Sequence, residues 1–178
     1  MKNILIVMIA FSTAFTGSLY FGYDTDDSEI LSMGYNHTLK QWNCEETGKP
    51  SWLLAAGLNY DINSDSFSFA SYYLLPMKAV TDKVSIWMSL GYGFLVDDGG
   101  AEDFMEAAFE LEGITASVDL STNLTYGLGM HYNYNEKMGF GIGKSVNTID
   151  LEIITMGLIL EADIDDFERT NLYFSYKF

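Results

Sequence analysis

The chain ends on the stretch Arg169 to Phe178, R-T-N-L-Y-F-S-Y-K-F, in which apolar and polar residues alternate. One parity is apolar throughout: Leu172, Phe174, Tyr176 and Phe178. The other parity is mainly polar: Asn171, Ser175 and Lys177. A period of two is that of a β-strand with one face toward an apolar medium and the other toward something polar. In a soluble protein a terminal Phe on such a strand would leave a sticky edge, so the stretch favours the last strand of a closed barrel embedded in lipid.

These residues resemble the C-terminal strand of bacterial outer-membrane β-barrels, which typically finish on Phe with aromatic or apolar residues at alternate positions before it. The resemblance implies a small outer-membrane β-barrel that is delivered to the barrel-assembly machinery. It also implies that Tyr176 and Phe178 form part of the assembly signal.

The N-terminus has the three regions of a secretory signal peptide. Met1 to Asn3 is a short positive start, Ile4 to Phe11 is apolar, and Ser12 to Gly17 is rich in small residues. The apolar run is shorter than the roughly 20 residues that a spanning helix needs. Cleavage after Ala14 or after Thr16 fits the small-residue rule, and export to the outer membrane is the expected consequence.

Composition and charge narrow the classes of function. We expect a signal peptide over residues 1–16 and one outer-membrane barrel domain over residues 17–178. The chain has 16 Gly, 12 Tyr and 12 Phe but only 2 Pro, which is typical of strands and tight turns. The formal net charge of −16 would repel nucleic acid, so nucleic acid is excluded as a partner. The single cysteine, Cys44, cannot form an internal disulfide.

Alternation continues through the middle of the chain. Trp52 to Tyr60, Val84 to Phe94 and Leu124 to Tyr134 alternate apolar residues with small or polar ones. These runs are about ten residues long, close to the 9–11 that a tilted strand needs to cross a bilayer. In the run after residue 66, the same reading assigns four residues to the apolar face: Phe67, Phe69, Tyr73 and Leu75. Aromatic residues toward the ends of the runs match two interfacial girdles.

The pattern predicts an all-β fold, a single antiparallel up-and-down transmembrane β-barrel with about ten strands and eight as the second choice. Met105 to Leu111 alternates with glutamates and is counted as a strand, so Gly113 is either a hairpin turn or a bulge. A bacterial barrel has an even number of strands, which favours the bulge. Ser121 to Asn123 is expected to be a turn, Thr148 to Leu160 one strand, and Glu161 to Glu168 an acidic loop.

A soluble lipocalin-like barrel that binds a ligand is the main alternative fold, because alternation alone does not distinguish inside from outside. In such a barrel the apolar faces point inward and the polar faces outward. The polar parity here is dominated by Gly, Ser, Ala, Thr and Asn, whereas a soluble exterior would be rich in Lys and Glu. The membrane barrel is therefore preferred.

An outer-membrane lipid-modifying enzyme is the other alternative, and the sequence argues against it. Lipid A deacylases pair a His with a Ser two residues on, whereas His131-Tyr132-Asn133 has Asn at that position. His37 is the other histidine of the chain, and no spaced cluster of metal ligands or cofactor motif accompanies it. We expect no catalytic site, no cofactor and no resident metal.

Divalent cations are a candidate partner of three acidic segments: Asp24–Glu29, Asp97–Asp103 and Glu161–Glu168. None of these segments has the fixed ligand spacing of an EF-hand, which favours an ordinary solvated surface.

The inward parity is expected to hold a network of acidic groups that share a few bases. Its predicted members are Glu106, Glu110, Glu112, Asp119, Glu152 and Arg169. Buried carboxylates without partners would be destabilising, so a hydrogen-bonded, water-containing lumen is expected. The sequence thus predicts a plugged barrel, embedded in outer-membrane lipid, with a structural, adhesion or binding role or a minor channel role.

Shortening the aromatic terminus tests the assembly signal. We expect Phe178→Ala to reduce membrane assembly while leaving export intact. Losing one exposed aromatic removes only about 1.5–3 kcal/mol of burial, so a large assembly defect would indicate recognition rather than stability. The measurement is the heat-dependent mobility shift of the folded fraction over time, and wild-type assembly kinetics in the variant would contradict the prediction.

Overall fold

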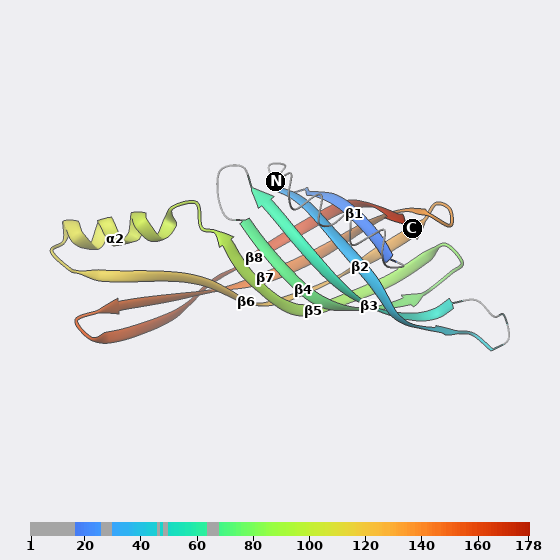
Figure 1. The fold of residues 1–178 in the computed structure, drawn as a ribbon, viewed down its shortest axis with the longest axis horizontal. Coiled ribbons are helices and arrows are strands. Elements are labelled where there is room, and N and C mark those ends of the chain that lie inside the picture. Colours follow the sequence, from blue (N-terminus) through green and yellow to red (C-terminus); the bar gives the residue numbers. More distant parts are fainter. Residues whose placement is uncertain (1–16, 26–29, 46, 48–49, 64–67) are drawn as a thin grey trace.

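In the computed structural model, which describes residues 17–25, 30–45, 47, 50–63 and 68–178, the chain forms a closed antiparallel β-barrel (Figure 1). The expected signal peptide lies outside the described residues. The strands follow chain order around the barrel: β1 Gly17–Asp24, β2 Ile30–Asn43, β3 Pro50–Asn63, β4 Ser68–Ala79, β5 Val84–Asp97, β6 Ala116–Asn133, β7 Met138–Thr155 and β8 Leu158–Lys177.

The C-terminal stretch closes the barrel. β8 pairs with β1 in a continuous register that includes Leu19 opposite Tyr176 and Phe21 opposite Phe174. The up-and-down topology is confirmed. The strand number is eight in the described part of the chain, the second choice rather than the first.

The segment Ala101–Leu111 is the helix α2, whereas the sequence predicted a strand there. Gly99 and Gly100 precede it with φ values of 64° and 82°. At its other end Gly113 has φ 76°, and the amides of Gly113 and Ile114 donate to the carbonyls of Glu110 and Phe109. This is the Schellman arrangement, which needs a left-handed residue after the helix. Gly113 is therefore a helix terminator and neither a hairpin turn nor a bulge.

Three further boundaries differ from the prediction. A two-residue turn at Met156 and Gly157, with φ 49° and 79°, divides the run expected to be one strand. Such positive φ values at both positions suit a tight hairpin. The acidic segment 161–168 continues β8 instead of forming a loop. The predicted turn at Ser121–Asn123 is a register shift within β6, between Thr122 and Thr125.

The outer surface of the barrel is apolar, as in a transmembrane barrel. Its exposed side chains on neighbouring strands include Leu58, Leu74, Met88, Leu90, Leu128 and Ile142. This arrangement is opposite to that of a lipocalin-like barrel, so the soluble alternative is wrong. Within the described residues no helix is long and apolar enough to cross a membrane.

The face assigned to β4 is wrong. Tyr72 and Leu74 are more than half exposed on the outside, whereas Phe69 and Leu75 are buried and Tyr73 lines the lumen. The prediction failed because both faces of β4 carry large apolar or aromatic residues, so alternation did not identify the outer one. Phe67 lies outside the described residues.

Three strands continue beyond the barrel as an extension, with α2 beside them (Figure 1). β6, β7 and β8 have 18, 18 and 20 residues, whereas the other strands have 8 to 14. A hydrophobic cluster of Phe69, Leu120 and Ile149 lies where the extension meets the barrel. Ala101 and Met105 of α2 pack against this cluster, one helical turn apart.

Two glutamates of α2 cap the outer edge of β6 in this region. The backbone amide of Val118 donates to the Glu106 carboxylate at 2.9 Å, and that of Leu120 donates to the Glu102 carboxylate at 2.7 Å. Unpaired strand edges are open to pairing with other chains unless they are covered. The helix therefore covers the edge of β6 with side-chain acceptors in place of another strand.

The start of α2 should depend on pH through Asp98. The backbone amides of Glu102 and Gly100 donate to this carboxyl and hold its pKa below the ordinary value of 3.8. A lowered folded-state pKa stabilises the helix start above the unfolded pKa, and this contribution is lost as the pH falls through the folded value. We expect Asp98→Ala to lower the hydrogen-exchange protection of the α2 amides at pH 6, and the difference from wild type to decrease only below about pH 4 and to vanish once the pH is below the folded-state pKa of Asp98.

The matched control is Glu136→Ala, which removes an acid from the turn between β6 and β7. Its α2 protection should equal that of the wild type at every pH. A difference between Asp98→Ala and wild type that persists at pH 2 would show that Asp98 acts through packing and not through its charge.

Candidate functional site in the barrel lumen

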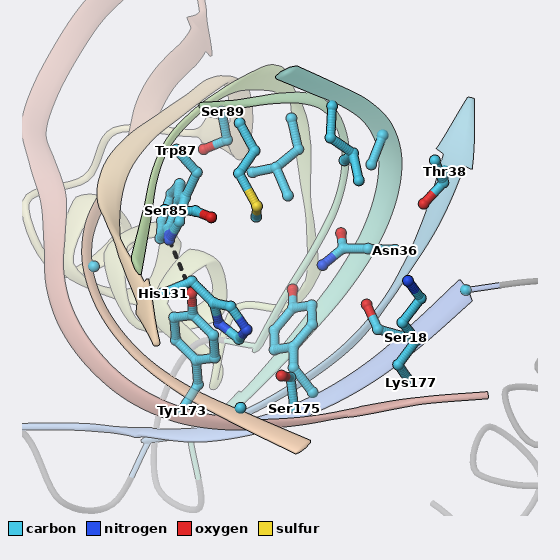
Figure 2. A pocket seen from close by; sticks show the side chains of 18 of the residues that line it. Ser18, Asn36, Thr38, Ser85, Trp87, Ser89, His131, Tyr173, Ser175 and Lys177 are labelled. Atoms are coloured by element: carbon cyan, nitrogen blue, oxygen red, sulfur yellow. Dashed lines mark hydrogen bonds between the residues drawn. The ribbon is translucent and has the colours of Figure 1, made fainter. Parts of the chain in front are cut away.

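The lumen contains a cavity of about 310 Å³ that reaches the end of the barrel where Gly17 and Lys177 lie. Lys137 of the turn between β6 and β7 and Met138 at the start of β7 line its mouth, and Arg169 lies at its inner end. Figure 2 shows the mixed character of the wall, with Ser18, Asn36 and Thr38 facing Trp87 and His131 across the cavity. A small eight-stranded barrel has room for little more than its own side chains or one small ligand.

An aromatic stack occupies one side of the cavity. His131 lies parallel to Tyr173 with ring centroids 5.8 Å apart, and the Trp87 indole N–H donates to the Tyr173 hydroxyl at 2.8 Å (Figure 2). The rings lie against alternate glycines of β7. A side chain at Gly139 would collide with His131, one at Gly141 with Tyr173, and one at Gly143 with Trp87. The alternate glycines therefore provide the space in which the rings stack.

A chain of phenols and amides crosses the lumen beside this stack. The Tyr20 hydroxyl donates to the Asn59 amide oxygen at 2.7 Å and lies 2.9 Å from the Tyr73 hydroxyl, which lies 2.9 Å from the Asn36 amide oxygen. Asn59 is oriented by its own amide N–H group, which donates to Asp61 at 2.5 Å. Each phenol has one proton and donates it to an amide oxygen, Tyr20 to Asn59 and Tyr73 to Asn36. On the Asn59 side the chain continues to the Asp61 carboxylate.

An ion pair lies at the inner end of that chain. Arg169 and Asp61 are each 2% exposed, and their charged atoms are 2.5 Å apart. The Ser32 hydroxyl donates to the same carboxylate at 2.6 Å. Asp24, the last residue of β1, is 1% exposed and is the register partner of Asn171 in β8. Removing one partner of such a buried pair leaves an uncompensated charge, which is far more costly than removing both.

The hydrophobic cluster closes the lumen next to this ion pair. Phe69 is directly opposite Asp61 in the β3–β4 register, and Ile149 follows Asn147 by two residues on the inner face of β7. Phe69 is 2% exposed and Ile149 8% exposed, so the cluster is tightly packed. Among the described residues, the cavity therefore ends against an apolar plug beneath α2, and it opens at the end where Gly17 and Lys177 lie.

The predicted acidic network is only partly in the lumen. Arg169 is buried there, but its partner is Asp61, which was not among the predicted residues. Glu106, Glu110 and Glu112 lie on α2 or directly after it, because the segment is a helix outside the barrel. Asp119 and Glu152 face each other as register partners of β6 and β7 in the extension, beyond the lumen. The expectation of an acidic interior is wrong for these five residues.

Sequence reasoning missed the aromatic side chains of the lumen. Trp87, Tyr20 and Tyr173 occupy the otherwise small and polar parity of their strands, and each was overlooked because the ladder beside it was apolar. The available signal was the row of glycines on β7, which indicates that large groups from other strands must fill the space opposite.

No catalytic arrangement stands out among the described residues. His131 stacks on Tyr173, and burial in the aromatic stack, not contact with a nucleophile, defines its position. Across the same residues, no three His, Cys, Asp or Glu side chains converge in a way that could hold a metal ion. The phenols, amides and rings of the cavity instead suit hydrogen bonding and packing.

Comparison with known proteins finds similarity to solved structures. No family model matches the chain, and no curated protein matches it. A de novo designed transmembrane β-barrel is 11% identical over 92% of this chain and 93% of its own, with a TM-score of 0.45. The outer membrane protein Ail of Yersinia pestis is 16% identical over 92% of this chain and 99% of its own, with a TM-score of 0.46.

The ion pair gives a stability prediction. Arg169→Gln should lower the free energy of unfolding by about 3–5 kcal/mol, because Asp61 is left buried without its cation. Adding Asp61→Asn should recover a large part of the loss. Urea-induced unfolding of the refolded protein in phospholipid vesicles measures both. If the double variant is destabilised by the sum of the two single variants, the two groups are energetically independent and the prediction fails.

Proposed function

We propose that this chain is a small bacterial outer-membrane barrel without catalytic activity, in which the barrel anchors the extension of β6, β7, β8 and α2 and the extension binds a partner outside the cell. The barrel-assembly machinery is the proposed partner during insertion, through Tyr176 and Phe178. The single observation that carries the binding role is the uncovered outer edge of β8 in the extension.

The orientation follows from the lengths of the connections. Short turns at 80–83 and 134–137 lie at the end that holds both described termini, whereas α2 and the β7–β8 hairpin lie at the opposite end. Outer-membrane barrels have short periplasmic turns and longer extracellular segments. The extension is therefore proposed to face the outside.

The two edges of the extension differ. β6 is capped by Glu102 and Glu106, whereas β8 has β7 on one side and, among the described residues, no strand on the other before Thr170. From Leu158 to Glu168 the strand thus has a free edge. An extended segment of another protein can add to such an edge through main-chain hydrogen bonds.

The hairpin geometry identifies the free backbone groups. Thr155 and Leu158 flank the two-residue turn and are register partners, so they exchange hydrogen bonds with each other. Alternate residues then face the other way, which directs the amides and carbonyls of Ile159 and Glu161 toward the free edge. The side chains around them are apolar and exposed: Leu158 64%, Ile159 61% and Leu160 55%.

The charge of this edge favours a basic partner. The sequence from 161 to 168 contains five acidic residues and no basic one. Acidic residues of α2 add to the same end of the molecule. Complementary charge speeds association and orients the partner, so we propose an extended segment that alternates apolar and basic residues.

The test uses a labelled synthetic peptide, Val-Lys-Val-Lys-Val-Lys-Val, and the refolded protein in nanodiscs. We expect saturable binding by fluorescence anisotropy, weakened about tenfold or more by Ile159→Pro, which removes one free-edge donor and leaves the pairing with β7 intact.

Ile159→Thr is the matched control, because it changes the same side chain but keeps the amide and a strand-forming residue. Its affinity should stay close to that of the wild type. Equal affinity of Ile159→Pro and wild type, or equal binding of a Val/Glu peptide, would overturn the proposed mode of binding.

A further inference from the structure

A row of two lysines and two tryptophans crosses three neighbouring strands on the outer surface of the barrel. Trp42 of β2 is the register partner of Trp52 of β3, and Trp52 is in turn the register partner of Lys78 of β4. The Lys40 ammonium lies 4.8 Å from the ring centroid of Trp42, and that of Lys78 lies 5.3 Å from that of Trp52. We call these four residues the Lys-Trp row.

The row lies on the outward parity of its strands, and Trp52 also reaches the rim of the cavity. A register shift between Thr38 and Lys40 changes the parity of β2, so that Lys40 pairs with outward-facing Leu54 while Gln41 pairs with Leu53 of the cavity wall. Trp42 is 43% exposed and Trp52 is 47% exposed. Within the described part of the chain neither Lys40 nor Lys78 forms an ion pair with a carboxylate. Their charges are therefore available to a ligand on the lipid side.

The row also lies at the level of a membrane interface. Lys78 precedes the turn at 80–83 by two residues, at the end of the barrel that holds the termini. Trp is enriched where the headgroups meet the hydrocarbon, since its ring is apolar and its N–H is polar. Lysine at the same level extends its ammonium group toward the headgroups.

Basic residues are concentrated at this end of the molecule. Of the described lysines and arginine, only Lys144 and Arg169 lie elsewhere; the others are Lys40, Lys78, Lys83, Lys137 and Lys177. Lys144 is ion-paired with Glu168, and Arg169 is buried against Asp61. The opposite end carries the acidic helix and the acidic part of β8. The surface that meets lipid on the termini side is thus the one suited to anionic headgroups.

We infer that the Lys-Trp row binds anionic phospholipid headgroups in the leaflet on the side of the chain termini, with one lipid phosphate between Lys40 and Lys78. The indole rings pack against the upper acyl chains and the glycerol, and they hold the two ammonium groups in place through cation–π contacts. Each lysine near an anionic surface contributes about 1 kcal/mol of attraction, which corresponds to about fivefold in affinity. The inference rests on the proposed membrane location but not on the binding role of the extension.

The test is fluorescence quenching in vesicles of phosphatidylcholine that contain a small fraction of either brominated phosphatidylglycerol or brominated phosphatidylcholine. Bromine quenches only tryptophans that contact the labelled lipid, so Trp42 and Trp52 report, whereas Trp87 lies inside the lumen and gives a constant background. We expect the wild type to prefer phosphatidylglycerol about fivefold or more at low salt, and the preference to decrease as salt rises.

Lys40→Gln/Lys78→Gln should reduce the preference to about one. Lys144→Gln/Lys177→Gln removes the same number of charges from outside the row, since Lys177 lines the cavity and Lys144 lies away from this end, and it should keep the wild-type preference. Equal quenching by the two lipids in the wild type, or loss of the preference in both double variants, would overturn the inference. Absence of quenching by either lipid would instead show that the barrel is not in the bilayer, which contradicts the proposed location.

Discussion

The narrow bore of an eight-stranded barrel is the constraint on which the rest of the structure depends. Such a barrel leaves space for little beyond its own side chains, so every large group that points inward needs a small residue across from it. Here the glycines of β7 leave space for the rings of His131, Tyr173 and Trp87, and the phenol–amide chain occupies the lumen beside these rings. The buried guanidinium of Arg169 enters this space with a carboxylate partner, Asp61.

Beyond the rim of the barrel a different constraint applies, because a sheet that leaves the cylinder regains two edges. The structure satisfies one edge with glutamate carboxylates from α2, and the same helix adds Ala101 and Met105 to the plug below it. The helix therefore closes the lumen and covers the β6 edge at once. On β8 no described element does the same, and an uncovered edge of that length in a folded protein is more consistent with a binding surface than with an accident of packing.

The sequence predicted the parts of the fold that depend on one apolar face and one small, polar face. The terminal strand, the strands β3 and β5 and the part of β6 from Leu124 onward are of this kind. Prediction failed on β4, where both faces carry large residues, and on α2, whose alternating glutamates also fit a helix. For α2 the decisive signals were present, since Asp98, Gly100 and Gly113 are a start and a stop for a helix. The pairing of Asp61 with Arg169 could not be read from sequence, because only the closed barrel brings β3 and β8 together across the lumen.

The closed end of the lumen and the separation of charge both limit where the protein can contact other molecules. Among the described residues, the polar cavity ends at one side against Phe69, Leu120 and Ile149. Interactions with other molecules are then left to the open mouth of the cavity and to the outer surfaces. Acidic residues and a free strand edge lie at one end, and lysines over tryptophan rings lie at the other. A barrel whose ends differ in this way has a preferred orientation in an asymmetric membrane, since anionic phospholipid headgroups attract one end and repel the other.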